Sequence, residues 1–106
     1  MITVISDLRT YNVTIDGHAC YAEEKGKDIV CAAVSILCYT LIEELTANQD
    51  KLMTMQVSDD QQCMKIMACP QEAYAPIIDA LFEFFVKGTL LLHDHYPNNV
   101  LSIVKG

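Results

Sequence analysis

A histidine and a cysteine flank a short charged segment in the stretch GHACYAEEKGKDIVCAAVS, residues 17–35. The thiolate is the nucleophilic form of cysteine, and a histidine within hydrogen-bond reach can take the thiol proton and later protonate a leaving amine. His18 is the only histidine before residue 93. The pair predicts acyl-transfer chemistry if the fold brings His18 and Cys31 together. The alternative is that Cys31 is a small apolar residue buried at the start of a helix.

An apolar pattern of helical spacing begins beside this cysteine. It runs from Ile29 to Ala47, and Asp28 is a suitable N-cap for it. Cys31 would then lie in the first helical turn, where unpaired N–H groups and the helix dipole stabilise a thiolate. Ser35, one turn further on the same face, could orient the site or donate a hydrogen bond. We expect backbone N–H groups at the helix start to bind the oxyanion of the reaction intermediate.

The segment between the two residues differs in character from the helix that follows it. Residues 19–27 carry four charges, show no apolar periodicity and include Gly26 as a potential hinge. We expect this segment to form a mobile flap over the site.

The remaining elements must hold the pair in place. Two β-rich segments, residues 2–6 and 11–16, predict strands joined by a turn, and Gly17 ends the second strand just before His18. The helix over residues 29–47 is apolar nearly all round, so a sheet and either a second helix or a second subunit must cover it.

The second half of the chain predicts a hairpin, a helix and a last strand. The hairpin strands are expected over residues 51–57 and 62–69, the helix from Pro76 to about Tyr96, and the strand over residues 100–105. The order ββαββαβ indicates an α+β domain with two helices on one face of a mainly antiparallel or mixed sheet. We expect one domain over residues 1–106.

Composition limits the classes of function. Fourteen acidic and seven basic residues give a net charge of −7, which argues against direct nucleic-acid binding and favours a basic partner. The chain shows no secretory signal, and its uninterrupted apolar runs are too short to span a membrane, so we expect a soluble cytoplasmic protein. The five cysteines include no CxxC pair, which argues against a thiol redox protein and favours reduced, mostly buried thiols.

A second histidine cluster, LLHDHYP, raises the question of a metal site. His93 and His95 are two residues apart on the expected helix and therefore point to different faces, so joint ligation with Asp94 is disfavoured. We interpret this segment as a solvated helix end and expect no metal.

The blocks DGHA and GKDIVCAAVS resemble the signature of the ribosomal-processing cysteine protease family, Prp, whose members have about this length. The resemblance implies an α+β homodimer that removes a short N-terminal extension from a large-subunit ribosomal protein by cutting after a pair of phenylalanines. It places the catalytic histidine at His18 and the nucleophile at Cys31. Gly17 and Ala19 belong to the GHA block, and Asp28 belongs to the DIVCA block together with the nucleophile. No metal or organic cofactor is implied.

Cys20 departs from the family pattern, in which a polar residue often follows GHA and the loop is slightly shorter. This difference bears on the flap and on sequence preference at the cleavage site. A disulfide between Cys20 and Cys31 is disfavoured in a reducing cytosol. A non-catalytic dimeric module that binds a ribosomal or phage protein segment remains the alternative function, and the reactivity of Cys31 distinguishes the two.

Overall fold

The computed structural model describes residues 1–17, 25–60 and 63–106, without the side chains of residues 25–28. The described strands and helices follow the predicted order ββαββαβ. They are β1 (Ile2–Asp7), β2 (Asn12–Asp16), α1 (Lys25–Ala47), β3 (Leu52–Asp59), β4 (Cys63–Pro70), α2 (Ala75–His95) and β5 (Val100–Lys105). Two short 3-10 turns that the sequence pattern does not predict precede β3 and α2; they are Gln49–Lys51 and Glu72–Tyr74.

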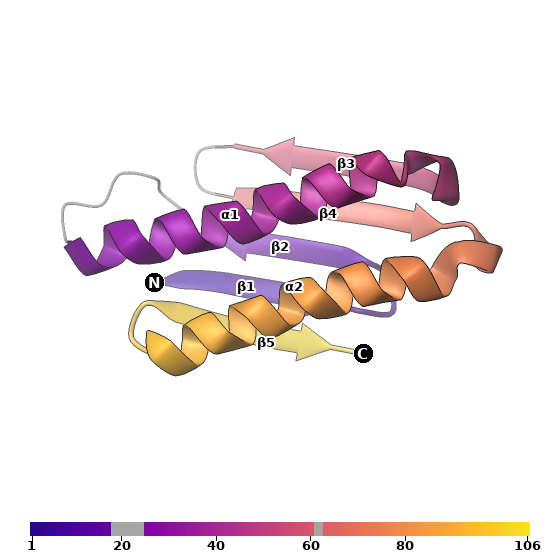
Figure 1. Ribbon diagram of the computed structural model, residues 1–106. Coiled ribbons are helices and arrows are strands. Elements are labelled where there is room, and N and C mark those ends of the chain that lie inside the picture. The colour runs from indigo at the N-terminus through magenta and orange to yellow at the C-terminus, as the bar shows by residue number, and fades with distance from the viewer. Residues whose placement is uncertain (18–24, 61–62) are drawn as a thin grey trace.

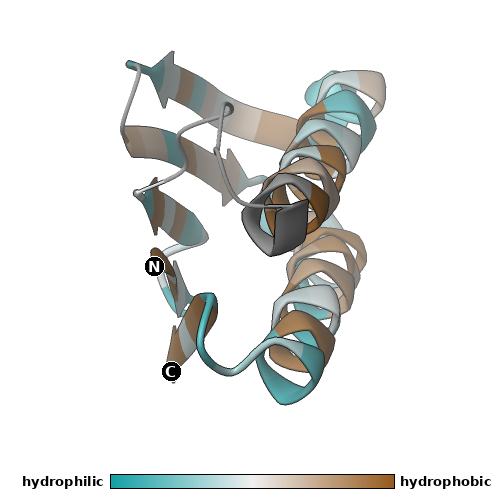
Figure 2. Ribbon diagram, turned by 90° about the vertical axis from the view of Figure 1, so that its left-hand side faces the viewer, coloured by the Kyte–Doolittle hydropathy of each residue, from teal (hydrophilic) through white to brown (hydrophobic). Residues whose placement is uncertain are grey.

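The strands form one mixed sheet in the order β3-β4-β2-β1-β5, so β3 and β5 are its edges. The β1–β2, β2–β4 and β3–β4 pairs are antiparallel, and β1–β5 is parallel. Both helices lie on one face of the sheet, with α1 above the β3–β4–β2 side and α2 above the β1–β5 side (Figure 1). Figure 2 shows the resulting two layers, in which the other face of the sheet carries no helix. The predicted α+β architecture is confirmed.

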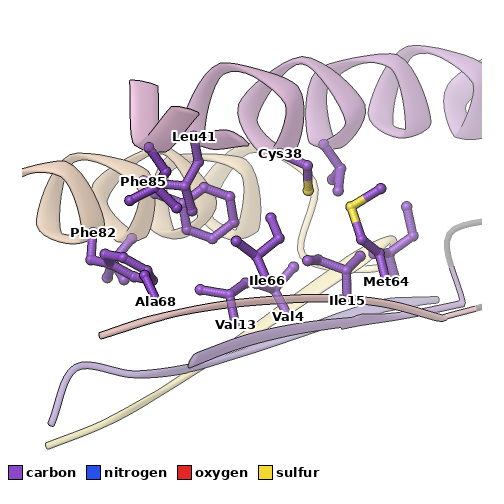
Figure 3. Packing of buried hydrophobic residues seen from close by; sticks show 14 of the residues in the cluster. Val4, Val13, Ile15, Cys38, Leu41, Met64, Ile66, Ala68, Phe82 and Phe85 are labelled. Carbon is purple, nitrogen blue, oxygen red and sulfur yellow. The ribbon is translucent and has the colours of Figure 1, made fainter. Parts of the chain in front are cut away.

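The core lies between the sheet and the helices. Alternate strand residues point toward the helix layer, as the period of two requires. Val4, Val13, Ile15 and Ile66 on three neighbouring strands are fully buried, and Figure 3 shows them beneath Cys38, Leu41 and Phe85. Each large apolar side chain buried in this way contributes about 1.5–3 kcal/mol to folding.

α1 begins earlier than predicted. The helix starts at Lys25, so Asp28 lies inside the first turn and is not the N-cap. The prediction began the helix where the apolar pattern begins, but lysine has good helix propensity and extends a helix without adding an apolar stripe. Gly26 costs about 1 kcal/mol relative to alanine and does not end the helix. Residues 25–27, expected in the flap, are therefore helical.

One segment of α1, Ile29–Ala47, is long and apolar enough to cross a membrane by length and composition alone. The length of uninterrupted apolar runs does not reveal this segment, because polar residues separate its apolar ones. In the structure Val30, Val34 and Leu45 of this segment are buried in the core. About a third of the segment is buried, and this buried face packs in the core between α1 and the sheet.

Candidate active site

Cys31 lies in the second turn of α1, and its side chain belongs to the buried core cluster. Only 7% of the residue is exposed, so the thiol is nearly covered by the fold. Both interpretations of the sequence therefore retain support: Cys31 packs as a core residue, and a small part of its surface still reaches solvent.

The early start of α1 changes the electrostatic argument for Cys31. Only the first four N–H groups of a helix lack an intrahelical partner, and the field of the helix dipole falls off beyond the first turn. In an α-helix the N–H of Cys31 points to the carbonyl of residue 27, so this group is not available to bind an oxyanion. The expectation that Cys31 lies in the first turn is wrong, and ionisation of its thiol must depend more on a neighbouring base.

His18, the proposed base, lies outside the described residues, as do Ala19, Cys20 and the greater part of the expected flap. Gly17, the last described residue before them, has a backbone φ of +81°. A Cβ atom at Gly17 would lie 2.6 Å from the carbonyl oxygen of Met1. Glycine is therefore required here by backbone conformation and close approach, which gives it a structural role at the end of β2.

Cys31 is part of a stripe along α1. Positions four, seven and eleven residues apart lie on one side of a helix that turns about 100° per residue. The Cys31 stripe consists of Cys31, Ser35, Cys38 and Ile42. Ser35 is half-buried, one turn from Cys31, as expected.

The Cys31 stripe lies on the side of α1 that faces away from α2. The opposite flank of α1 lines two apolar grooves between the helices, through Ala33, Leu37 and Leu41 among others. Because α2 covers the β1–β5 side of the sheet, the Cys31 stripe borders the side that ends at β3 (Figure 1).

Cys38, two turns beyond Cys31, is an inert thiol. Burial, assisted by the negative charge of Asp59 on β3, raises the pKa of the Cys38 thiol to about 12. Cys38 is 1% exposed, so it stays protonated at neutral pH. Asp59 is paired with Met64, which packs in the core beside Cys38 (Figure 3), so the end of β3 lies near the Cys38 level of the stripe.

The histidines near the end of α2 make separate backbone contacts. Nδ1 of His93 lies 2.7 Å from the carbonyl oxygen of Val100, and Nδ1 of His95 lies 2.8 Å from that of Leu91. Among the described residues, no group of three or more His, Cys, Asp or Glu could hold a metal ion. The His93 contact joins the end of α2 to the start of β5, and the His95 contact lies within the last turn of α2.

The comparisons with known proteins bear on the chemistry of Cys31. A family model described as cysteine protease Prp matches residues 1–101. The chain belongs to the cysteine protease Prp family. It is therefore an enzyme of the cysteine protease class, and the match spans nearly the whole chain, including Cys31, both helices and the strands β1 to β4. A comparison with curated proteins finds no match.

Solved structures share this fold. SMU.848 from Streptococcus mutans is 30% identical with a TM-score of 0.80, and the alignment covers 98% of this chain and 95% of that one. The ribosomal processing protease Prp from S. aureus, in complex with a substrate peptide, is 21% identical with a TM-score of 0.79 and 99% and 100% coverage. A second structure of that protease, with a covalently linked product peptide, is 20% identical with a TM-score of 0.75 and the same coverage.

Proposed function

We propose that this protein removes the short N-terminal extension of a large-subunit ribosomal protein by cutting after a pair of phenylalanines. The observation that carries the proposal is the family match over residues 1–101, which includes the GHA and DIVCA blocks. The S. aureus protease of the same fold is described as a ribosomal processing enzyme and has been seen with substrate and product peptides. A net charge of −7 also favours a basic substrate such as a ribosomal protein tail.

In the proposed mechanism Cys31 is the nucleophile and His18 the general base. His18 takes the thiol proton, and the thiolate sulfur attacks the carbonyl carbon of the second phenylalanine. The tetrahedral intermediate collapses as His18 protonates the departing amine, leaving a thioester on Cys31. Water, activated by His18, then hydrolyses the thioester and restores the thiol. No metal or organic cofactor takes part.

We also propose that residues 1–106 form one catalytic domain and that two copies associate as a cytoplasmic homodimer. Support comes from the outer side of the helix layer, where an apolar groove of about 370 Å³ lies between α1 and α2. Ile36 and Phe84 beside the helix grooves are 65% and 75% exposed, large apolar side chains that a second copy would cover. Gly88 allows the close helix packing beneath, since a Cβ there would lie 2.7 Å from Leu37.

The experiment that tests the proposed activity is incubation with N-terminal extensions of large-subunit ribosomal proteins, followed by mass spectrometry of the products. We expect a single cut after the phenylalanine pair with the wild-type protein, and none with Cys31→Ser or His18→Ala. Cys69→Ser is the matched control, because Cys69 is exposed on β4 and alternates with buried Ala68, so its side chain lies on the face of the sheet without helices. Equal cleavage by Cys31→Ser and Cys69→Ser would exclude the mechanism.

A further inference from the structure

The edge of β3 carries backbone groups with no neighbouring strand among the described residues. The N–H of Ala68 on β4 donates to the carbonyl of Tyr11, on the β2 side, so its neighbour Met67 faces β3. Met67 is paired with Gln56, which therefore directs its own backbone groups toward β4. Because direction alternates along a strand, Met55 and Val57 present their N–H and C=O groups to the open edge.

The same two residues direct their side chains toward the helix layer. Met55 is paired with Ala68 and Val57 with Ile66, and both partners on β4 are buried in the core. Directly paired residues share a face of the sheet, so Met55 and Val57 lie on the α1 side. Val57 is nevertheless 43% exposed, because no element of the described chain covers this end of the edge strand.

β3 also lacks the usual protection of an edge strand. Residues 53–58 include no charged residue and no proline, the two devices that most often prevent an edge from pairing with another chain. Its one irregularity, a register shift between Leu52 and Thr54, lies at the end remote from Asp59. An extended peptide could therefore pair with the outward groups of Met55 and Val57 without meeting a blocking side chain.

The end of the β3 edge at Asp59 lies close to the part of α1 that carries Cys31, the proposed nucleophile. Asp59 at the end of β3 is paired with Met64, and Met64 packs in the core beside Cys38 of α1 (Figure 3). The end of β3 therefore lies near that turn of α1, and Cys31 lies two helical turns from it on the same stripe. Seven residues of helix span about 10 Å, a distance that an extended chain covers in about three residues. A peptide paired with β3 would thus reach the level of Cys31 shortly after it passes Asp59.

We propose that the substrate peptide binds as an added strand on the β3 edge, hydrogen-bonded to Met55 and Val57, with alternate side chains on the apolar surface beside the Cys31 stripe. This proposal rests on the proposed protease function and identifies where that substrate lies. Main-chain pairing supplies affinity for any extended peptide, and the surface formed by Val57 and Met55 favours apolar residues such as phenylalanine.

Proline substitution tests this pairing, because proline removes one edge N–H without removing a hydrogen bond between β3 and β4. Val57→Pro is the test variant. Val104→Pro on the opposite edge is the matched control: Val104 is 40% exposed, and its N–H also points outward, since the adjacent Lys105 accepts a bond from Leu8 on the β1 side. Circular dichroism and thermal melts establish that both variants are folded.

With a phenylalanine-pair peptide as substrate, we expect Val57→Pro to lower kcat/KM about tenfold, mainly through KM, and Val104→Pro to leave it unchanged. Equal activity of the two variants would overturn the proposal while leaving the protease function intact. A change in elution volume on size exclusion for Val57→Pro alone, with no loss of kcat/KM, would also overturn it, because the edge would then pair with a second copy.

Amide hydrogen exchange tests peptide binding at the β3 edge independently of turnover. In the Cys31→Ser variant the peptide should slow exchange at the amides of Met55 and Val57 and leave that of Val104 unaffected. Protection at β3 without cleavage by the wild-type protein would support the docking site and refute the protease proposal. Unprotected β3 amides at saturating peptide would refute the docking site.

Discussion

The pH dependence of thiol alkylation separates a reactive Cys31 from a merely buried one. The perturbation is iodoacetamide added to the native protein at a series of pH values, because only the thiolate reacts. A cysteine activated by a histidine has a pKa between about 3.5 and 7.5, so about a quarter or more of it is thiolate near pH 7. Cys38, whose pKa is raised to about 12 by burial and by Asp59, has on the order of one thiolate in 100,000 at that pH.

The burial of Cys31 and Cys38 affects the absolute rates of their alkylation. Cys31 is 7% exposed and Cys38 1% exposed, so restricted access slows both reactions. Access changes the plateau of a pH–rate curve but not its midpoint, and the midpoint is therefore the quantity to compare. We expect Cys31 to reach half of its maximal rate below pH 8, and Cys38 to stay unlabelled until the protein unfolds.

The assay is mass spectrometry of the digested protein after timed labelling, with exposed Cys69 as a control for reagent activity. His18→Ala should move the midpoint of Cys31 upward, because the second helical turn offers the thiolate little help from the dipole. A Cys31 that labels only on unfolding, as Cys38 should, would refute the assignment of the nucleophile. A midpoint that is unmoved in His18→Ala would refute the assignment of the base.

Three further predictions concern stability and association. Tyr11 donates a hydrogen bond to Asp79, which raises the pKa of Tyr11 to about 12. Tyr11→Phe should therefore lower the free energy of unfolding by about 1 kcal/mol below pH 10, as measured in denaturant titrations. This difference between wild type and variant should disappear as the pH rises from 10 to 12, because Tyr11 then ionises in the folded protein. Gly17→Ala should cost about 1–2 kcal/mol in the same assay, because of the positive φ and the approach to the Met1 carbonyl; unchanged stability would contradict that strain. Phe84→Asp should raise the dimer dissociation constant more than about tenfold in light-scattering measurements and leave the monomer folded; an unaltered dimer would place the interface elsewhere.

The sequence alone predicts those parts of the fold that depend on local patterns. Alternation in residues 11–16 and 62–69 indicates strands, and helical spacing through Phe82 and Phe85 indicates α2, which Gly88 does not interrupt. The start of α1 is not predicted, because the helix extends through polar residues before the apolar pattern begins. Strand order is not predicted either, since the pairing of β1 with both β2 and β5 depends on contacts between distant segments.

The candidate site, like the fold, is predicted only in part from the sequence. Residue types and the family resemblance predict Cys31 as the nucleophile, and helical spacing places Ser35 one turn from it on the same face. Nothing in the local sequence indicates that Met55 and Val57 lie on the α1 side of an edge strand, because this position follows from the pairing of β3 with β4 and from the order of the strands in the sheet. The absence of charge and proline in residues 53–58 is the one sequence signal that would have drawn attention to this edge.

The most direct test of the account is to trap the thioester that it requires. The protein is mixed with a phenylalanine-pair peptide, quenched in acid within one turnover, digested and analysed by mass spectrometry. We predict an acyl adduct on Cys31 whose mass equals that of the peptide fragment ending in the phenylalanine pair, and no adduct in Cys31→Ser. An adduct on another cysteine, or cleavage by Cys31→Ser at the wild-type rate, would contradict the central claim.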